Sequence, residues 1–269
     1  MGEYVQIGEL KTWYDQDGKG EPLVLLHGGL CPNDTWAPQI PEFREHFRVL
    51  APERQGHGHT PDLDGPLSYD RMTANTIGFL ETVVSEPAPL VGWSDGGIIG
   101  LMIAISRPDL LRKLVVIGTN FDPGGIVPGA EEGLLSTPPD ADDMAMLRQM
   151  YEASSPDGAE HWPVVVDKFK TMAVRGPNIP VGDLRRIRGR TLVIAGDDDM
   201  VSLEHTTELF HTILDAELAV VPGASHFVSM EKPELVNRII LSFLENDPGP
   251  TMMPIRRAAQ QADTPRTGQ

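Results

Sequence analysis

The sequence lacks the features that would place the protein in a membrane or in a disulfide-forming compartment. Its 269 residues include a single cysteine, Cys31, which excludes an internal disulfide framework and a metal site built from cysteines alone. No stretch approaches the roughly 20 apolar residues that a membrane-spanning helix needs, and no charged-then-apolar signal segment follows Met1. We therefore expect a cytoplasmic protein that does not act at a membrane.

Basic residues are scarce beside acidic ones. The chain has 22 Lys and Arg against 39 Asp and Glu, a formal net charge of −17. A surface of this sign repels phosphate backbones, so we expect no nucleic-acid partner. The excess of acidic residues either keeps the protein soluble or favours a cationic substrate, and the composition alone is consistent with both.

Short apolar runs alternate with helical patterns along most of the chain. This alternation predicts a mostly parallel sheet with helices on both faces, and near-continuous hydrophobicity suits strands buried on both sides. Residues 4–14 alternate loosely and predict an antiparallel lead-in. The predicted strands are 22–26, 47–51, 88–91, 114–117, 191–195 and 217–221, and the predicted helices are about 69–84, 97–107, 203–214 and 233–246.

The alternation breaks between residues 118 and 191, where Pro- and Gly-rich turns precede two helical patterns. We interpret residues 121–185 as a helical cap inserted into an α/β core that comprises residues 1–120 and 186–246. The segment 247–269 has no hydrophobic periodicity and is predicted to be disordered. The length suits one large domain with such an insertion.

The sharpest chemical motif is Gly92-Trp93-Ser94-Asp95-Gly96, placed directly after an apolar run and directly before a helical pattern. A G-x-S-x-G sequence between strand and helix is typical of a nucleophile elbow, whose tight turn lifts the serine hydroxyl clear of the sheet. The N-terminus of the following helix points its free N–H groups at the same place. Ser94 is therefore the candidate nucleophile.

A serine hydroxyl needs a base, and the base needs a group that orients it. His226 lies in the loop after the last predicted strand, at the carboxyl edge of the sheet, and is the candidate base. Asp197, Asp198 and Asp199 all follow the strand before it, and residue type alone does not choose among them. We choose Asp199, because the loop needs a few residues to project a carboxylate towards the histidine.

The oxyanion formed by attack on a carbonyl needs hydrogen-bond donors. We assign the backbone N–H groups of Asp95, which follows the nucleophile, and of Gly29, in the loop after the first buried strand. Asp95, Trp93 and Leu30 flank these groups and are the predicted substrate contacts. Gly28-Gly29 lacks the G-x-G-x-x-G spacing of a dinucleotide site, and this chemistry requires neither a cofactor nor a metal, so none is predicted.

The chain as a whole resembles the α/β-hydrolase family. The resemblance rests on the loop 27–29, the turn 56–58, the elbow 92–97, Gly196-x-x-Asp199 and Gly223-x-x-His226, which occur in the family's order. It implies the α/β-hydrolase fold: a mostly parallel eight-stranded sheet with helices on both faces, an inserted helical cap, and a triad formed here by Ser94, Asp199 and His226.

Within that family, the elbow from Gly92 to Ile98 resembles that of the valacyclovir hydrolase (biphenyl hydrolase-like) group. That resemblance implies hydrolysis of α-amino acid esters, with Asp95 receiving the substrate ammonium. A second interpretation of Asp95 is that its carboxylate only stabilises the helix dipole, by about 0.3–1 kcal/mol. In either case a carboxylate beside the nucleophile disfavours anionic substrates.

The sequence thus predicts a cofactor-independent serine hydrolase that cleaves a small carboxylic ester. Three alternatives share the fold: a lactonase or carbon–carbon bond hydrolase with the same triad, a cofactor-free haloperoxidase, and a ligand receptor without turnover. The complete set of Ser94, Asp199 and His226 argues against the receptor. Neither the physiological ester nor the oligomeric state can be derived from the sequence.

Overall fold

The computed structural model describes residues 2–247 and 251–255. Within them eight strands form one sheet, in the order β1-β2-β4-β3-β5-β6-β7-β8. Strands β3 to β8 run parallel, whereas β2 is antiparallel to both of its neighbours. The strands are β1 (Gly2–Ile7), β2 (Leu10–Asp17), β3 (Pro22–Leu26), β4 (Arg48–Pro52), β5 (Ala88–Trp93), β6 (Leu111–Ile117), β7 (Arg190–Asp198) and β8 (Ala216–Ser225).

The predicted mostly parallel eight-stranded sheet is confirmed, with differences at its two edges. The single lead-in expected over residues 4–14 is a hairpin of two strands, β1 and β2. Strands β7 and β8 both run further towards their carboxyl ends than their apolar runs indicated. They do so because backbone pairing continues past the apolar residues, across an irregularity, to Asp198 and Ser225.

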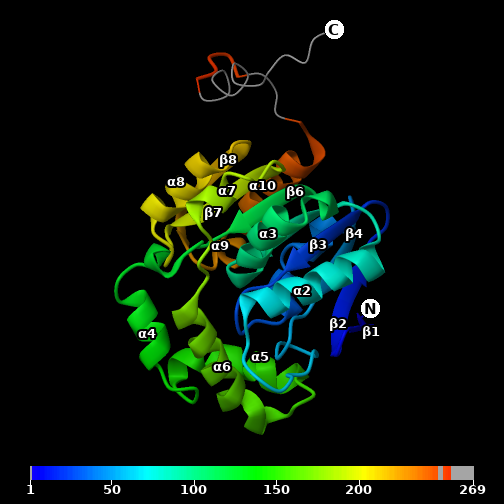
Figure 1. Ribbon diagram of the computed structural model, residues 1–269, viewed down its shortest axis with the longest axis vertical. Coiled ribbons are helices and arrows are strands. Elements are labelled where there is room, and N and C mark those ends of the chain that lie inside the picture. Colours follow the sequence, from blue (N-terminus) through cyan, green and yellow to red (C-terminus); the bar gives the residue numbers. More distant parts are fainter. Residues whose placement is uncertain (1, 248–250, 256–269) are drawn as a thin grey trace.

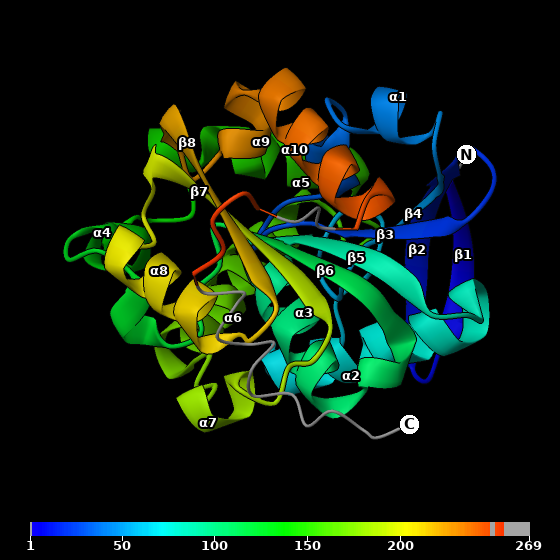
Figure 2. The same cartoon turned by 90° about the horizontal axis from the view of Figure 1, so that it is seen from above.

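The helices cover both faces of the sheet (Figure 2), with α2, α3 and α8 on one side and α1 and α10 on the other. No helix of the described residues has the length and apolar character needed to cross a bilayer. The helices are α1 (Ile40–Phe43), α2 (Tyr69–Phe79), α3 (Asp95–Ser106), α4 (Ala130–Ser136), α5 (Ala145–Ser154), α6 (Trp162–Arg175), α7 (Val181–Leu184), α8 (Leu203–Thr212), α9 (Val228–Glu231) and α10 (Pro233–Glu245). The last part of the predicted helix 69–84 forms a π-helical turn at Leu80–Val84.

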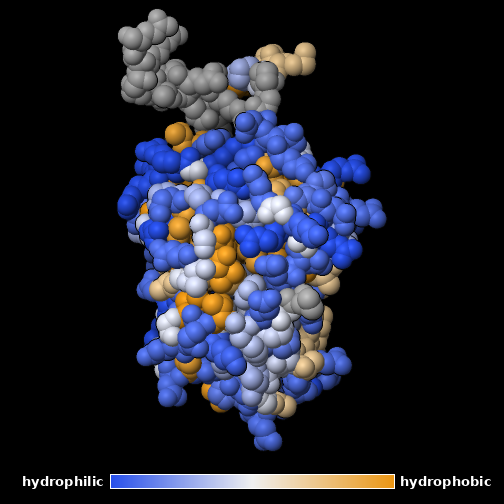
Figure 3. Space-filling model, turned by 90° about the vertical axis from the view of Figure 1, so that its right-hand side faces the viewer, coloured by the Kyte–Doolittle hydropathy of each residue, from blue (hydrophilic) through white to orange (hydrophobic). Residues whose placement is uncertain are grey.

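Each central strand contributes to two separate cores. In β3, Val24 and Leu26 pack in the cluster that includes α2 and α3, whereas Leu23 and Leu25 pack in the cluster that includes α1 and α10. This division follows from the strand period of two, because successive side chains point to opposite faces of a sheet. Outside these cores, hydrophilic residues cover most of the face shown in Figure 3, interrupted by a central band of hydrophobic ones.

Helices α4, α5 and α6 lie together at one end of the molecule, away from α10 and β8 (Figure 1). All three fall within the segment 121–185 that the sequence indicated as a cap, whereas α7, at the end of that segment, contacts α3 of the core. Pro163 stands in the first turn of α6, and Tyr151 packs on Trp162 with ring centroids 5.4 Å apart. The predicted tail, apart from residues 247 and 251–255, lies outside the described residues.

A buried carboxylate links helix α6 and the turn before it to the core. Asp62, in the loop between β4 and α2, has a side chain only 4% exposed. Its oxygens lie 2.5 Å from Lys168 Nζ on α6 and 2.9 Å from His161 Nε2, and they accept a hydrogen bond from Gln55 Nε2 at 2.9 Å. Burial alone would raise the pKa of the Asp62 carboxyl, but the hydrogen bonds from Gln55, Lys168 and His161 hold that pKa below its ordinary value.

We predict that Asp62→Asn lowers the free energy of unfolding by about 1.5–3 kcal/mol at neutral pH, the usual worth of a hydrogen bond to a charged group. Because the pKa of Asp62 is lowered in the fold, its carboxylate stabilises the protein above its ordinary pKa, and this contribution disappears as pH falls through the lowered value. Urea unfolding of both proteins across the acid range measures the difference. The control is Asp109→Asn, which alters an exposed, solvent-screened pair with Arg107 and should change stability far less than Asp62→Asn does. A loss that persists unchanged in acid would contradict this account.

Candidate active site

Ser94 lies at a strained turn between β5 and α3. Its backbone has φ 54° and ψ −119°, a region that costs a non-glycine residue on the order of 1–3 kcal/mol. The turn is possible because its neighbours are glycines: a Cβ on Gly92 would lie 2.3 Å from the carbonyl oxygen of Gly96, and one on Gly96 would lie 2.1 Å from that of Leu26. The G-x-S-x-G spacing therefore dictates the local backbone.

The register of β7 and β8 brings two distant loops together. Asp198 at the end of β7 pairs with Ser225 at the end of β8. The next residue along each strand is Asp199 and His226, so these two side chains leave the sheet from adjacent positions. Asp199 Oδ1 also accepts a hydrogen bond from the backbone N–H of Val201 at 3.0 Å, which fixes the carboxylate in its loop.

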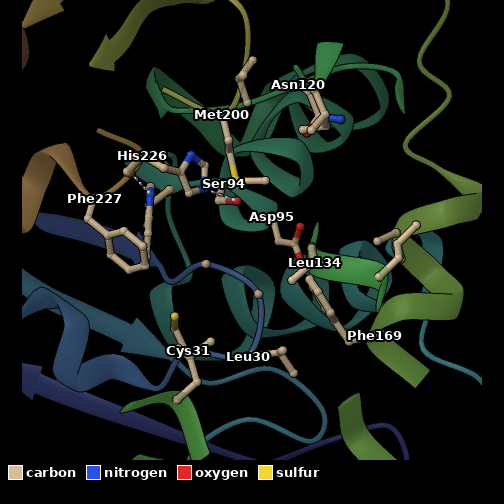
Figure 4. Close-up of a pocket in the computed structure, with 18 of the residues that line it drawn as sticks. Leu30, Cys31, Ser94, Asp95, Asn120, Leu134, Phe169, Met200, His226 and Phe227 are labelled. Atoms are coloured by element: carbon tan, nitrogen blue, oxygen red, sulfur yellow. Dashed lines mark hydrogen bonds between the residues drawn. The ribbon is translucent and has the colours of Figure 1, made fainter. Parts of the chain in front are cut away.

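The side chains of Asp199, His226 and Ser94 form a continuous hydrogen-bonded chain, and Figure 4 shows the part between His226 and Ser94. His226 Nδ1 lies 2.8 Å from Asp199 Oδ1, and His226 Nε2 lies 3.1 Å from Ser94 Oγ. The Asp199 side chain is fully buried and that of His226 is 14% exposed. Such an arrangement can move a proton from the serine to the histidine while the carboxylate orients the ring.

The other two candidate acids lie elsewhere. Asp197 and Asp198 are both exposed, and Asp197 Oδ1 accepts a hydrogen bond from the backbone N–H of Ala224 at 3.2 Å. The structure therefore brings Asp199, and neither of its neighbours, to His226. No group of three or more His, Cys, Asp or Glu side chains in the described part of the chain is arranged to hold a metal ion.

Ser94 and His226 open into a cavity of about 420 Å³ that is lined by residues of the α/β part and of helices α4, α5 and α6. Its two carboxylates are Asp95 and Asp143, and no Lys or Arg is among the described residues that line it. Met200 and Phe227 lie on the side of His226 (Figure 4). The apolar lining comprises Leu30, Cys31, Trp93, Ile126, Leu134, Leu135, Met144, Met146, Leu147, Phe169, Ala173, Met200, Val201 and Phe227.

Asp95 is a buried carboxylate with one oxygen that has no hydrogen-bond partner among the described residues. It is 6% exposed, Oδ1 accepts a hydrogen bond from the Tyr69 hydroxyl at 2.9 Å, and Oδ2 has no hydrogen-bond partner among the described residues. Burial raises the pKa of Asp95, although the Arg54 charge and the Tyr69 hydroxyl act in the opposite direction. A half-satisfied carboxylate in a cavity wall is typical of a ligand site.

The remaining predicted residues also line the cavity. A Cβ on Gly29 would lie 2.3 Å from Phe169 Cε2 and 2.7 Å from Asp95 Oδ2, so no larger residue fits there without displacement. Leu30 is buried in the wall with φ 56°. Trp93 has a second contact that the sequence did not indicate, since its Nε1 donates to the backbone carbonyl of His226 at 2.9 Å.

Sequence reasoning missed two residues around Asp95. Tyr69 lies 26 positions away, at the start of α2, and Arg54 follows β4. Neither Tyr69 nor Arg54 lies in a sequence motif that indicates a function. A tyrosine at a helix start and an arginine after a strand are common on surfaces, and only the packing of this fold buries them beside the elbow.

The sequence pattern of the Alpha/beta hydrolase family matches residues 23–239, which include the elbow and both loops of the hydrogen-bonded chain. The chain belongs to the alpha/beta hydrolase family. The 2-hydroxy-6-oxo-2,4-heptadienoate hydrolase of Pseudomonas putida is 28% identical to it over 91% of this chain and 96% of that protein. The serine hydrolase BPHL of Mus musculus is 24% identical, over 90% of this chain and 85% of that protein.

Solved structures agree with this assignment. A serine hydrolase involved in carbazole degradation superposes with a TM-score of 0.75 at 25% identity, covering 91% of this chain and 98% of that one. The predicted family and the predicted resemblance to the biphenyl hydrolase-like group are thus confirmed. The protein is a serine-type hydrolase that acts on small molecules.

We predict that Asp199→Asn lowers kcat by about 10⁴-fold, because only this carboxylate fixes the tautomer of His226 and stabilises its imidazolium form. Asp197→Asn and Asp198→Asn serve as matched controls of the same chemistry, and each should stay within a few-fold of the wild type. Steady-state kinetics with a chromogenic ester compares the three. A large loss in either control, with Asp199→Asn active, would assign the acid to another residue.

Proposed function

We propose that the protein is a cofactor-independent serine esterase that cleaves a small carboxylic ester, neutral or cationic, through an acyl-enzyme on Ser94. The observation that carries this proposal is the hydrogen-bonded chain from Asp199 through His226 to Ser94, which ends in a largely apolar cavity. A cavity of about 420 Å³ suits a small-molecule ester.

In this mechanism the Ser94 hydroxyl attacks the ester carbonyl while His226 accepts its proton at Nε2. Asp199 holds the ring and stabilises the imidazolium form. Backbone N–H groups of Gly29 and Asp95 donate hydrogen bonds to the oxyanion of the tetrahedral intermediate. His226 then protonates the leaving alcohol, and the acyl group remains on Ser94 as an ester.

Deacylation uses the same groups in reverse. Water replaces the alcohol in the cavity, and His226 takes a proton from it as it attacks the acyl carbonyl. The second tetrahedral intermediate collapses when His226 returns the proton to Ser94 Oγ, and the carboxylic acid leaves. Every proton that moves passes between Ser94, His226, water and the alcohol, so the cycle balances without a further reactant.

The charges of the cavity favour this substrate class over the main alternative. The Pseudomonas putida relative acts on a heptadienoate, which carries a carboxylate. The cavity of the present chain offers Asp95 and Asp143 and, among the described residues that line it, no Lys or Arg to receive such an anion. Electrostatic repulsion therefore argues for an ester without a negative charge, and the unpartnered Asp95 Oδ2 suits a substrate ammonium, as in an α-amino acid ester.

A carbon–carbon bond hydrolase or lactonase with the same residues is the second candidate, and the similarity to the Pseudomonas putida enzyme supports it. Comparing the turnover of neutral esters with that of a dienoate distinguishes an esterase from a carbon–carbon bond hydrolase. An esterase turns over p-nitrophenyl acetate and neutral aliphatic esters faster than a 2-hydroxy-6-oxo-dienoate, whereas a carbon–carbon bond hydrolase shows the reverse order.

We predict that Ser94→Ala lowers ester turnover by 10⁴-fold or more, on the scale of about 10⁶-fold known for comparable nucleophiles, and leaves the fold intact. Alanine keeps a Cβ and therefore the same strained backbone, so the melting temperature should stay close to that of the wild type. Turnover and thermal unfolding are measured on the same preparation. A folded variant with wild-type turnover would rule out the serine mechanism.

We predict that Asp95→Asn removes a preference for α-amino esters and spares neutral esters. In the wild type a charge-assisted hydrogen bond of about 1.5–3 kcal/mol should favour valyl over isovaleryl esters by roughly tenfold to a hundredfold in kcat/KM. The Asn side chain keeps the shape and the backbone donor but loses the charge. An unchanged ratio in the variant would reduce Asp95 to a helix-dipole residue and leave the general esterase in place.

The same ratio should depend on pH. Because burial raises the pKa of Asp95, the carboxylate takes up its proton at a higher pH than a solvated aspartate does. On acidification the preference for the amino ester should therefore fall before solvated aspartates titrate, and the ratio for Asp95→Asn should stay flat.

A further inference from the structure

The carbonyl oxygen of Gly28 is held from inside the protein by three donors. Arg54 Nη2 donates to it at 2.9 Å, His27 Nδ1 lies at 2.8 Å, and the backbone N–H of Cys31 donates at 3.4 Å. Arg54 Nη1 also donates to the carbonyl oxygen of His27. A carbonyl oxygen has two lone pairs, so these donors saturate it. This carbonyl precedes Gly29, whose N–H we assign to the oxyanion hole.

The protonation state of His27 follows from its partners. Its Nε2 accepts the backbone N–H of Arg54 at 3.2 Å, which places the hydrogen of the neutral ring on Nδ1, 2.8 Å from the Gly28 oxygen. Arg54 Nη2 also lies 3.0 Å from this Nδ1, but it donates to the same Gly28 oxygen. Burial, together with the charge of Arg54, lowers the pKa of His27 well below its ordinary value and keeps the ring neutral. His27 is therefore a fixed donor to Gly28 throughout the neutral range.

Arg54 is an unusual residue for this place. It is 4% exposed, and no carboxylate of the described chain lies within ion-pairing distance of it. Its Nε has no hydrogen-bond partner among those residues either. Burial lowers the pKa of Arg54 to about 10, which leaves it charged at neutral pH. The negative charge of Asp95 offsets part of the cost of burying this cation, but the guanidinium forms no ion pair, and its hydrogen bonds go to the carbonyl oxygens of His27 and Gly28.

Planarity of the peptide bond links these contacts to the cavity. In a trans peptide the carbonyl oxygen and the N–H of the next residue point in opposite directions. Holding Gly28 oxygen towards the interior therefore turns Gly29 N–H towards the cavity that Gly29 lines. The following peptide is fixed as well, because Leu30 N–H donates to His57 Nε2 at 2.9 Å.

We propose that Arg54 is a positioning residue that holds the Gly28–Gly29 peptide in the orientation that forms the oxyanion hole. The guanidinium fork grips two successive carbonyls and so prevents this glycine-rich loop from flipping. It also polarises the peptide, which makes Gly29 N–H a stronger donor. This inference rests on the proposed esterase function and adds to it the residue that orients one oxyanion donor.

The test compares an ester with its thionoester, whose sulfur accepts hydrogen bonds poorly and so gains little from an oxyanion hole. Arg54→Met should lower kcat for the ester on the order of 10²-fold, the loss expected for one oxyanion donor, with KM little changed. The thionoester rate should fall far less, so the ester-to-thionoester ratio should also drop on the order of 10²-fold. A merely structural role would lower both rates together.

Thr60→Val is the matched control, since Thr60 is fully buried in the same loop region but contacts Glu53 and Trp13 rather than Gly28. It should leave the ratio at the wild-type value. If Arg54→Met does not fold, Arg54→Lys is measured instead. A lysine ammonium cannot hold both carbonyls in the fork geometry, so this variant should also lower the ester-to-thionoester ratio.

Ser94→Ala, assayed in parallel, separates the two proposals. If Ser94→Ala keeps its activity, the proposed function fails. If Ser94→Ala is inactive while a folded Arg54 variant retains the wild-type ratio, the positioning role of Arg54 is overturned and the esterase remains.

Discussion

The register between β7 and β8 is the constraint on which the site depends. Because Asp198 pairs with Ser225, the chain places Asp199 and His226 side by side, although 27 residues separate them. The elbow two strands away supplies Ser94 at the same carboxyl edge, where all the parallel strands end. A shift of one residue in this pairing would turn the carboxylate away from the imidazole, so the pairing of the two strands also assembles the hydrogen-bonded chain.

The two buried charged side chains near the elbow, Arg54 and Asp95, cost folding free energy but lie where the proposed reaction can use them. Arg54 and Asp95 are both buried, each has an atom without a hydrogen-bond partner among the described residues, and burial moves the pKa of each towards its neutral form. Fully paired or apolar residues would fold at lower cost. The two opposite charges offset part of each other's burial cost. The cation lies behind the loop that carries Gly29, and the anion lies in the cavity wall, where a substrate can supply the missing partner.

Short local motifs allowed much of the site to be predicted from the sequence. Features set by contacts between distant segments could not be predicted. The elbow around Ser94 is recognisable because glycines, strand and helix adjoin within a few residues, and loop length alone favours Asp199, which lies 2.8 Å from His226. The hairpin of β1 and β2, the extensions of β7 and β8, and the partners Tyr69 and Asp62 were not predictable. Each depends on strand pairing or on contacts between segments far apart in the chain, which local sequence patterns do not reveal.

The central claim is that hydrolysis passes through an ester on Ser94, and trapping that ester tests it most directly. The protein is mixed with a p-nitrophenyl ester that deacylates slowly, quenched in acid during turnover and measured by intact-protein mass spectrometry, followed by peptide mapping. The account predicts a mass increase equal to one acyl group, on the peptide that contains Ser94, and its disappearance when the substrate is exhausted. Steady turnover with no acylated protein, or with the acyl group on another residue, would contradict the account.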